Sequence, residues 1–127
     1  MASELHEKQV RFARLLPRLL DYVKILAAAD PRLEVVIGET YRPPETAALY
    51  ASQGRGSKTS LHMDKLAVDL LLFLNEPGGG VSLLEKTADY ALLGSYWKTL
   101  DGDARWGGNF INRPDGNHFS LTYQGRQ

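Results

Sequence analysis

The chain has 127 residues without an internal linker, a length that predicts a single domain over residues 1–127. It contains no cysteine, which excludes both a disulfide scaffold and a thiolate metal site. The 15 Lys and Arg residues balance 15 Asp and Glu residues, so the basic footprint typical of a nucleic-acid-binding protein is missing and no nucleic-acid partner is expected.

Residues 1–9 are polar and charged, and no apolar run of the kind found in a secretory signal follows them. The longest apolar run, residues 70–74, is far too short to cross a bilayer. We therefore expect a protein that is made in the cytoplasm without a signal peptide and does not insert into a membrane. A monomer is expected, although nothing in the sequence addresses the oligomeric state.

The first half of the chain predicts a long helix, a strand and a short helix. Apolar residues recur on one broad helical face over residues 8–29, where Pro17 introduces either a kink or a division into two shorter helices. The β-branched residues at 33–38 predict a strand, and residues 45–53 predict a short helix. A loop rich in Gly and Ser is expected at residues 54–59.

The second half predicts a nearly all-apolar strand at residues 67–74, as expected of a strand buried on both faces. A glycine-rich turn at residues 75–80 leads to a predicted helix at residues 84–100, and short strands are expected at 106–110 and 118–123. Helices combined with a few strands, without regular βαβ alternation, indicate an α+β fold. The residues expected on the inner face of the 84–100 helix are Ala88, Ala91, Leu92, Tyr96 and Trp97.

The predicted strand at 67–74 contains an acidic residue, Asp69, between apolar neighbours, and His62 precedes the same strand. An ionised carboxylate in such surroundings is costly unless another group pairs with it. A metal ion would serve, but an arginine or a cluster of loop amides would serve equally well.

A second pair of candidate residues lies near the C-terminus, where Asp115 stands three residues before His118. Pro114, Asp115 and Gly116 form a sequence typical of a turn. Taken alone, this segment is explained better by a turn that leads to a half-buried histidine than by a metal site.

The two segments together favour a metal site. His62, Asp69 and His118 provide two nitrogen ligands and one oxygen ligand, a set that suits zinc and leaves a fourth position open for water. Asp115 is then a spare carboxylate that could act as general base, and Arg42 is a spare cation in a stiff Tyr-Arg-Pro-Pro segment. Such a ligand set also binds other transition metals.

The order of these residues resembles the M15 family of zinc peptidases. The pattern consists of Ser60 with His62 and Asp69, then Trp106-Gly-Gly, then Asp115 three residues before the final histidine. The family includes D-Ala-D-Ala carboxypeptidases, D-Ala-D-Ala dipeptidases and phage L-alanyl-D-glutamate endolysins. The match covers residues 41–121 and looks most like the phage or prophage branch. It implies a small hedgehog/DD-peptidase-like domain with a short antiparallel sheet packed against helices.

The resemblance implies a role for each matching residue. His62, Asp69 and His118 match the zinc ligands of the family. Asp115 matches its acidic general base, and Arg42 matches the arginine that stabilises the oxyanion.

Two further matches and two departures concern the substrate cleft. Ser60 matches a serine that contacts the substrate or supports the first ligand, and Trp106 would line the cleft. Many members have Gly where this chain has Lys65, so a side chain must be accommodated there, for example by pointing into the cleft. Many also have Asp where this chain has Asn109, which can form hydrogen bonds but cannot act as a base.

The substrate implied by the resemblance is the stem peptide of bacterial peptidoglycan. We expect the endolysin activity, cleavage between L-Ala and D-Glu, on a cell wall that the protein reaches after release from the cytoplasm through a holin pore. A D-alanyl-D-alanine carboxypeptidase is the alternative within the family. Outside it, the sequence leaves open a metal nuclease, a non-catalytic, metal-stabilised wall-binding module, and a structural protein whose His and Asp side chains form ordinary hydrogen bonds.

Overall fold

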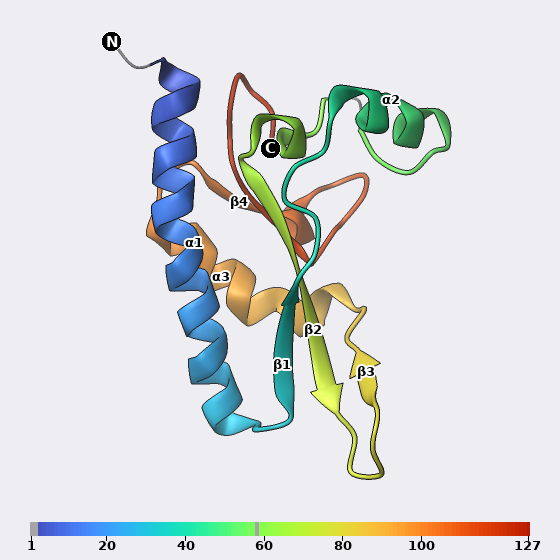
Figure 1. The fold of residues 1–127 in the computed structure, drawn as a ribbon. Helices are drawn as coiled ribbons and strands as arrows, with labels where there is room; N and C mark the ends of the chain where they lie inside the picture. The colour runs from blue at the N-terminus through green and yellow to red at the C-terminus, as the bar shows by residue number, and fades with distance from the viewer. Residues whose placement is uncertain (1–2, 58) are drawn as a thin grey trace.

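The computed structural model describes residues 3–57 and 59–127, so residue 58 of the predicted loop at 54–59 lies outside the described residues. The fold combines helices with one five-stranded sheet (Figure 1), as predicted for an α+β domain. Its helices and strands are α1 (Glu4–Ala29), β1 (Leu33–Ile37), α2 (Pro44–Ser52), β2 (Ala67–Asn75), β3 (Val81–Leu83), α3 (Ala91–Leu100), β4 (Ala104–Trp106) and β5 (His118–Leu121), with 3-10 turns η1 (Leu61–Asp64), η2 (Thr87–Tyr90) and η3 (Gly107–Asn109).

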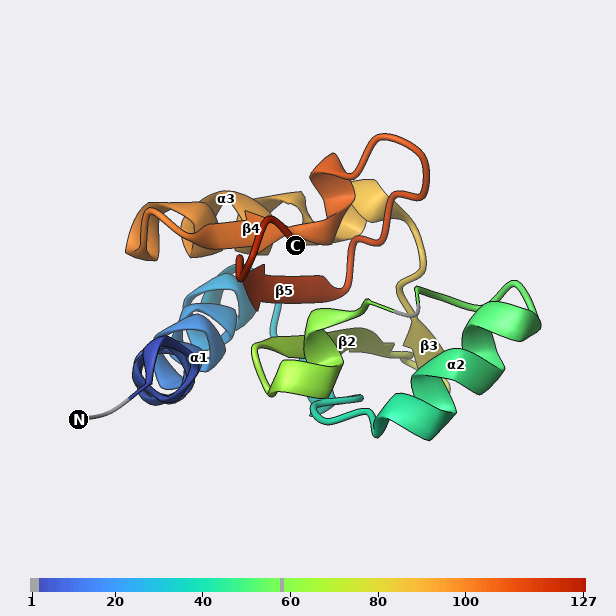
Figure 2. The same cartoon turned by 90° about the horizontal axis from the view of Figure 1, so that it is seen from above.

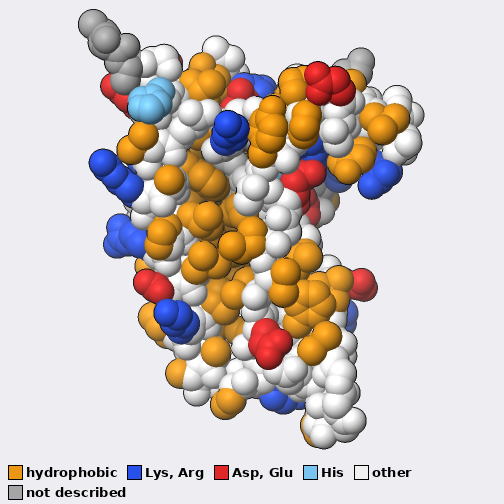
Figure 3. All heavy atoms as spheres, viewed as in Figure 1, with side chains coloured by type: hydrophobic (Ala, Val, Ile, Leu, Met, Phe, Trp, Pro, Cys, Tyr) orange, Lys and Arg blue, Asp and Glu red, His pale blue; other side chains and the backbone are white. Residues whose placement is uncertain are grey.

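The sheet is organised around β2. Its strand order is β1-β2-β5-β4, β3 also pairs with β2, and every pairing is antiparallel. β5 pairs with the first residues of β2, whereas β3 pairs with the last ones. Helices α1 and α3 pack together, and α2 lies apart from them (Figures 1 and 2). Figure 3 shows that the surface is hollowed between the part that carries α2 and the hairpin of β2 and β3.

The core lies between α1, α3 and the sheet. Helix α1 contributes residues spaced three or four positions apart, which brings them onto one face. The Trp97 ring of α3 is fully buried and meets Phe12 and Phe119 edge-on, with ring centroids 5.8 and 6.4 Å apart. Its indole nitrogen donates a hydrogen bond to the Ser120 carbonyl oxygen at 3.0 Å, so the polar end of this large side chain is satisfied in the core. The buried residues of α1 are Phe12, Leu15, Leu19 and Val23.

Helix α1 is a single helix that starts earlier than predicted. The Ser3 hydroxyl accepts a hydrogen bond from the His6 amide at 3.1 Å and caps the helix at its N-terminus. Pro17 does not divide the helix; it lies on the exposed side, where solvent can satisfy the carbonyl group that its missing N–H leaves free. Neither α1 nor any other helix in the described part of the chain has the length and apolar character needed to span a membrane.

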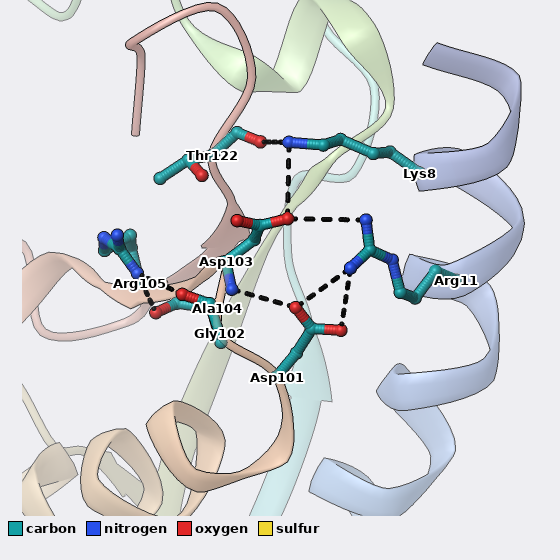
Figure 4. A network of polar contacts seen from close by, with 8 residues as sticks. All are labelled: Lys8, Arg11, Asp101, Gly102, Asp103, Ala104, Arg105 and Thr122. Atoms are coloured by element: carbon teal, nitrogen blue, oxygen red, sulfur yellow. Dashed lines mark hydrogen bonds and ion pairs between the residues drawn. The ribbon is translucent and has the colours of Figure 1, made fainter. Parts of the chain in front are cut away.

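A network of charged side chains fixes α1 to the C-terminal part of the fold (Figure 4). Arg11 Nη1 donates to both carboxylate oxygens of Asp101, at 3.2 and 3.1 Å, and Arg11 Nη2 lies 3.4 Å from Asp103. Lys8 contacts Asp103 at 3.5 Å and also donates to the Thr122 carbonyl oxygen. These contacts hold the ends of α3 and β5 against the first half of α1.

The predicted helix at 84–100 is wrong in its first half. Residues 81–83 pair with β2 as β3, and α3 starts only at Ala91. The Tyr90 hydroxyl donates to the Leu84 carbonyl oxygen at 2.8 Å and accepts from the Leu72 amide at 3.0 Å, which anchors the chain between β3 and α3. Of the predicted inner face, Trp97 is buried, Ala91 and Tyr96 are half-buried, and Ala88 and Leu92 are exposed.

The terminal strands are shifted from their predicted positions. The expected strand at 106–110 is instead β4, which ends at Trp106 and continues as the η3 turn. Strand β5 ends at Leu121, and Tyr123 forms an isolated bridge with Arg126. Strand β2 is buried mainly through alternate residues, so its two faces differ more than the prediction implied.

Candidate metal centre

Three side chains from separate segments converge beside the sheet. Asp69 of β2 and His118 of β5 lie directly opposite each other in the antiparallel pairing, and His62 comes from η1. His62 Nε2 lies 3.2 Å from Asp69 Oδ1, and His118 Nδ1 lies 3.6 Å from the same oxygen. One ligand atom of each residue lies within 4.8 Å of the other two, so the three residues could hold a metal ion.

The spacing of Asp69 from each histidine fits a tetrahedral metal ion. Zinc bonds to imidazole nitrogen and carboxylate oxygen of about 2.0–2.2 Å place neighbouring ligand atoms roughly 3.3–3.6 Å apart. The two contacts of Asp69 Oδ1, 3.2 and 3.6 Å, agree with this spacing. Among the described residues, buried Asp69 Oδ1 has no hydrogen-bond partner. An unpaired carboxylate oxygen facing two imidazoles is the arrangement expected of a cation site.

Local backbone structure fixes the position of His62. The Ser60 hydroxyl accepts a hydrogen bond from the His62 amide at 3.2 Å and caps the η1 turn. The imidazole is buried, and its Nδ1 lies 3.2 Å from the Thr40 carbonyl oxygen. A proton on Nδ1 makes this contact a hydrogen bond and leaves the Nε2 lone pair facing Asp69, the orientation that a metal ligand needs.

The charges of the three residues support one another. Burial raises the pKa of Asp69, but His118 and His62 oppose this effect strongly enough to lower the pKa to about 2. Burial lowers the pKa of His62, yet Asp69 and the Thr40 carbonyl outweigh it, so the net shift is upward. The carboxylate is therefore ionised at neutral pH and available to a cation.

A cleft of about 1060 Å³ opens over these side chains. His62 and His118 line it together with Ser60, Arg42 and Asp115, all residues singled out from the sequence. Asp115 is exposed on the wall of the cleft. The cleft walls nevertheless remove part of its hydration, and this burial together with repulsion from Asp69 raises the pKa of Asp115.

Arg42 is held in the cleft by Glu39, a residue that the sequence analysis did not single out. Arg42 Nε donates to Glu39 Oε1 at 2.8 Å, and Arg42 Nη2 donates to the same oxygen. Glu39 Oε1 also lies 3.6 Å from His62 Nδ1, and the Arg42 amide donates to the His62 carbonyl oxygen at 3.0 Å. Glu39 therefore links Arg42 to the candidate ligand His62. Its position three residues before Arg42 is the sequence feature that could have indicated this ion pair.

Trp106 was predicted to line the cleft, but it belongs to the core. The residue is 7% exposed, and its indole nitrogen donates to the Gly116 carbonyl oxygen at 2.7 Å. A Cβ atom added at Gly94 or Gly108 would lie 2.1 or 2.2 Å from the indole, so only glycine leaves room for the ring. Trp106 thus supports the loop that carries Asp115.

The two departures from the family pattern have local explanations. Lys65 adopts a left-handed conformation with φ of 58°, which favours glycine, and its ammonium group lies 5.2 Å from the Tyr41 ring centre rather than in the cleft. Asn109 Oδ1 accepts a hydrogen bond from Lys98 Nζ at 2.8 Å. Phe110, which the sequence analysis passed over, lines the cleft with its ring centre 5.4 Å from that of His118.

Comparison with known proteins establishes the fold. No protein-family model matches the chain, and no curated protein matches it. Among solved structures, it is similar to the crystal structure of the Serratia marcescens L-Ala D-Glu endopeptidase ChiX, with a TM-score of 0.62 and 24% identity. The match covers 94% of this chain and 81% of that chain. The fold is thus that of a small α+β domain shared with a solved peptidase.

Proposed function

We propose that this protein is a metal-dependent peptidase that hydrolyses the stem peptide of bacterial peptidoglycan. The observation that carries the proposal is the convergence of His62, Asp69 and His118 beneath a cleft that also contains Arg42 and Asp115. Two imidazoles and a carboxylate are a catalytic zinc ligand set that leaves a position open. The same cleft supplies both a carboxylate and a guanidinium, which a simple structural metal site does not need.

Each residue of the cleft has a separate role in the proposed hydrolysis. A bound zinc ion would supply Lewis acidity and lower the pKa of a water molecule towards neutrality. Asp115 accepts the proton of the attacking water and passes it to the nitrogen of the leaving amine. Arg42, whose Nε and Nη2 are occupied by Glu39, still has Nη1 to donate to the oxyanion of the scissile carbonyl group. Glu39 keeps this guanidinium in place.

The bond that we propose is cut lies between L-Ala and D-Glu. The support is the shared fold with ChiX, whose printed name is L-Ala D-Glu endopeptidase, together with the sequence pattern around the three ligands. A phage or prophage endolysin that reaches the wall after release is the biological role we propose. Cleavage of a terminal D-Ala residue and metal-stabilised wall binding without turnover are the competing functions.

The first experiment measures metal content and amine release from purified peptidoglycan. We expect about one zinc ion for each wild-type chain, and loss of both metal and activity in His118→Gln. Asp115→Asn should retain the metal but lose about 10²–10⁴-fold in kcat, because it lacks the general base. New amino-terminal D-Glu in the products would identify the endopeptidase, whereas free D-Ala would identify the carboxypeptidase.

The variants also separate catalysis from binding. A wild-type protein that binds metal and sediments with peptidoglycan but releases no amines would be a wall-binding module. A wild-type protein without metal or released amines would exclude the peptidase.

A further inference from the structure

The cleft above the candidate metal centre has more positive than negative side chains. Arg42, Arg55 and Arg113 line it, whereas Asp115 is the sole acidic side chain among its described lining residues. Arg55 follows α2, and Arg113 lies in the loop between η3 and β5, so the two belong to segments far apart in the chain. A cleft that gathers arginines from separate segments is suited to an anionic ligand.

The three arginines differ in how their charge is balanced. Arg42 forms an ion pair with Glu39. Arg55 Nη1 donates to the neutral side-chain oxygen of Gln53, at 3.0 Å. Within residues 3–57 and 59–127, neither Arg55 nor Arg113 forms an ion pair with a carboxylate. The surplus positive charge of the cleft therefore resides on Arg55 and Arg113.

Tyr50 contacts the guanidinium groups of both Arg55 and Arg42. The Arg55 guanidinium carbon lies 4.4 Å from the Tyr50 ring centre, and that of Arg42 lies 5.2 Å from the same ring. Two guanidinium groups on one aromatic ring repel each other, and a bound anion relieves this repulsion. Contact with the ring also restricts the Arg55 side chain, which reduces the entropy lost when a ligand binds.

We propose that Arg55 and Arg113 bind the free carboxylates of an acidic peptide substrate; this inference rests on the proposed function. When D-Glu is joined to the next residue through its side-chain carboxyl group, its α-carboxylate remains free, only two bonds from the nitrogen that leaves. Such a carboxylate must enter the cleft together with the scissile bond. The planar guanidinium group can donate two parallel hydrogen bonds to it, which a lysine cannot.

The test compares N-acetyl-L-Ala-γ-D-Glu-L-Lys with two analogues, one amidated at the D-Glu α-carboxylate and one at the C-terminal carboxylate. We expect the wild type to cleave the free acid at least tenfold more efficiently, measured as kcat/KM, than one or both amides. Arg55→Gln and Arg113→Gln should reduce this preference through a higher KM for the acid, with little change for the amide. If an arginine variant cleaves one amide as efficiently as the free acid, that arginine binds the carboxylate that is amidated in this analogue.

Matched variants control for general charge effects and for folding. Arg18→Gln removes an exposed arginine of α1 that does not line the cleft and should leave the preference unchanged. Arg113→Lys, which keeps the charge but loses the paired donors, should restore only part of it. Equal cleavage of acid and amides by the wild type would overturn the carboxylate site while leaving the peptidase intact. No cleavage of any of the three peptides would count against the proposed function itself.

Discussion

Asp115, on the wall of the cleft, carries a charge that its surroundings oppose. Burial and the nearby Asp69 raise the pKa of the Asp115 carboxyl group above that in the unfolded chain. A raised pKa means that the folded protein holds this proton more tightly than the unfolded one, so ionisation of Asp115 lowers stability as pH rises. Ionised Asp115, which is suited to accept a proton, therefore lowers the free energy of unfolding.

We therefore expect Asp115→Asn to stabilise the metal-free protein at pH 7. The gain should shrink as pH falls and disappear below about pH 4, the usual range of an aspartate in the unfolded chain, because both proteins are then neutral at this position. Urea unfolding of both proteins in chelator, at several pH values, measures the difference. A gain that is the same at every pH would show that the effect does not come from the charge.

Lys65 adopts a backbone conformation that is unfavourable for a residue with a side chain. Its φ of 58° costs a residue with a Cβ atom about 1 kcal/mol, a cost that glycine avoids. Lys65→Gly should therefore raise the free energy of unfolding by about 1 kcal/mol in denaturant experiments. Lys65→Ala is the matched control, because it removes the same contact with Tyr41 but keeps the Cβ atom, and it should give no gain. Destabilisation by the glycine variant would mean that the Tyr41 contact matters more than the backbone.

Among the larger elements, α3 and η3 meet through Trp106. The indole passes so close to Gly94 of α3 that an added Cβ atom would lie 2.1 Å from it. We expect Gly94→Ala to destabilise the protein by about 3 kcal/mol, because a buried ring cannot move aside without disturbing the core. Thermal unfolding measures this, with Gly102→Ala as control, since an added Cβ atom there meets nothing within 4 Å. Equal effects of the two substitutions would refute the close packing.

The long periodic pattern of α1 and the apolar run of β2 predicted those elements closely, because each pattern is local. The start of α3 could not be predicted in this way. Residues 81–83 pair with β2, and the Tyr90 hydroxyl bonds to the backbone of Leu72 and Leu84, so the chain before α3 is fixed by tertiary contacts that no local pattern reveals.

The candidate ligands were predictable for a different reason. Asp69 was conspicuous as a charged residue in an apolar strand, His62 precedes the same predicted strand, and His118 begins the last predicted strand. Trp106 was misplaced because an aromatic residue in a glycine-rich segment has the same sequence signature in a cleft as in a core. Glu39 was missed because its importance comes from its contacts with Arg42 and His62, which only the folded chain brings together.

At the scale of the whole molecule, the candidate metal centre joins three separate parts of the chain: η1, β2 and β5. Metal binding to the folded protein alone should therefore stabilise the entire domain. At a free zinc concentration 100 times the Kd, we expect a gain of about 2.7 kcal/mol, seen as a higher Tm that chelator reverses. His118→Gln should show no comparable shift. An equal shift in this variant would place the zinc elsewhere on the protein.

The cleft and the candidate metal centre are built from different kinds of structure. The three ligands stand on two paired strands and a capped turn, whereas much of the cleft wall comes from two loops, residues 54–57 and 110–115. Exchange of residues 54–57 or 110–114 would change the shape and charge of the cleft wall without replacing a candidate ligand or Asp115. Such a division would allow the ligand preference of the cleft to change while the candidate metal centre stays the same, and it makes residues 54–57 and 110–114 suitable positions for loop engineering.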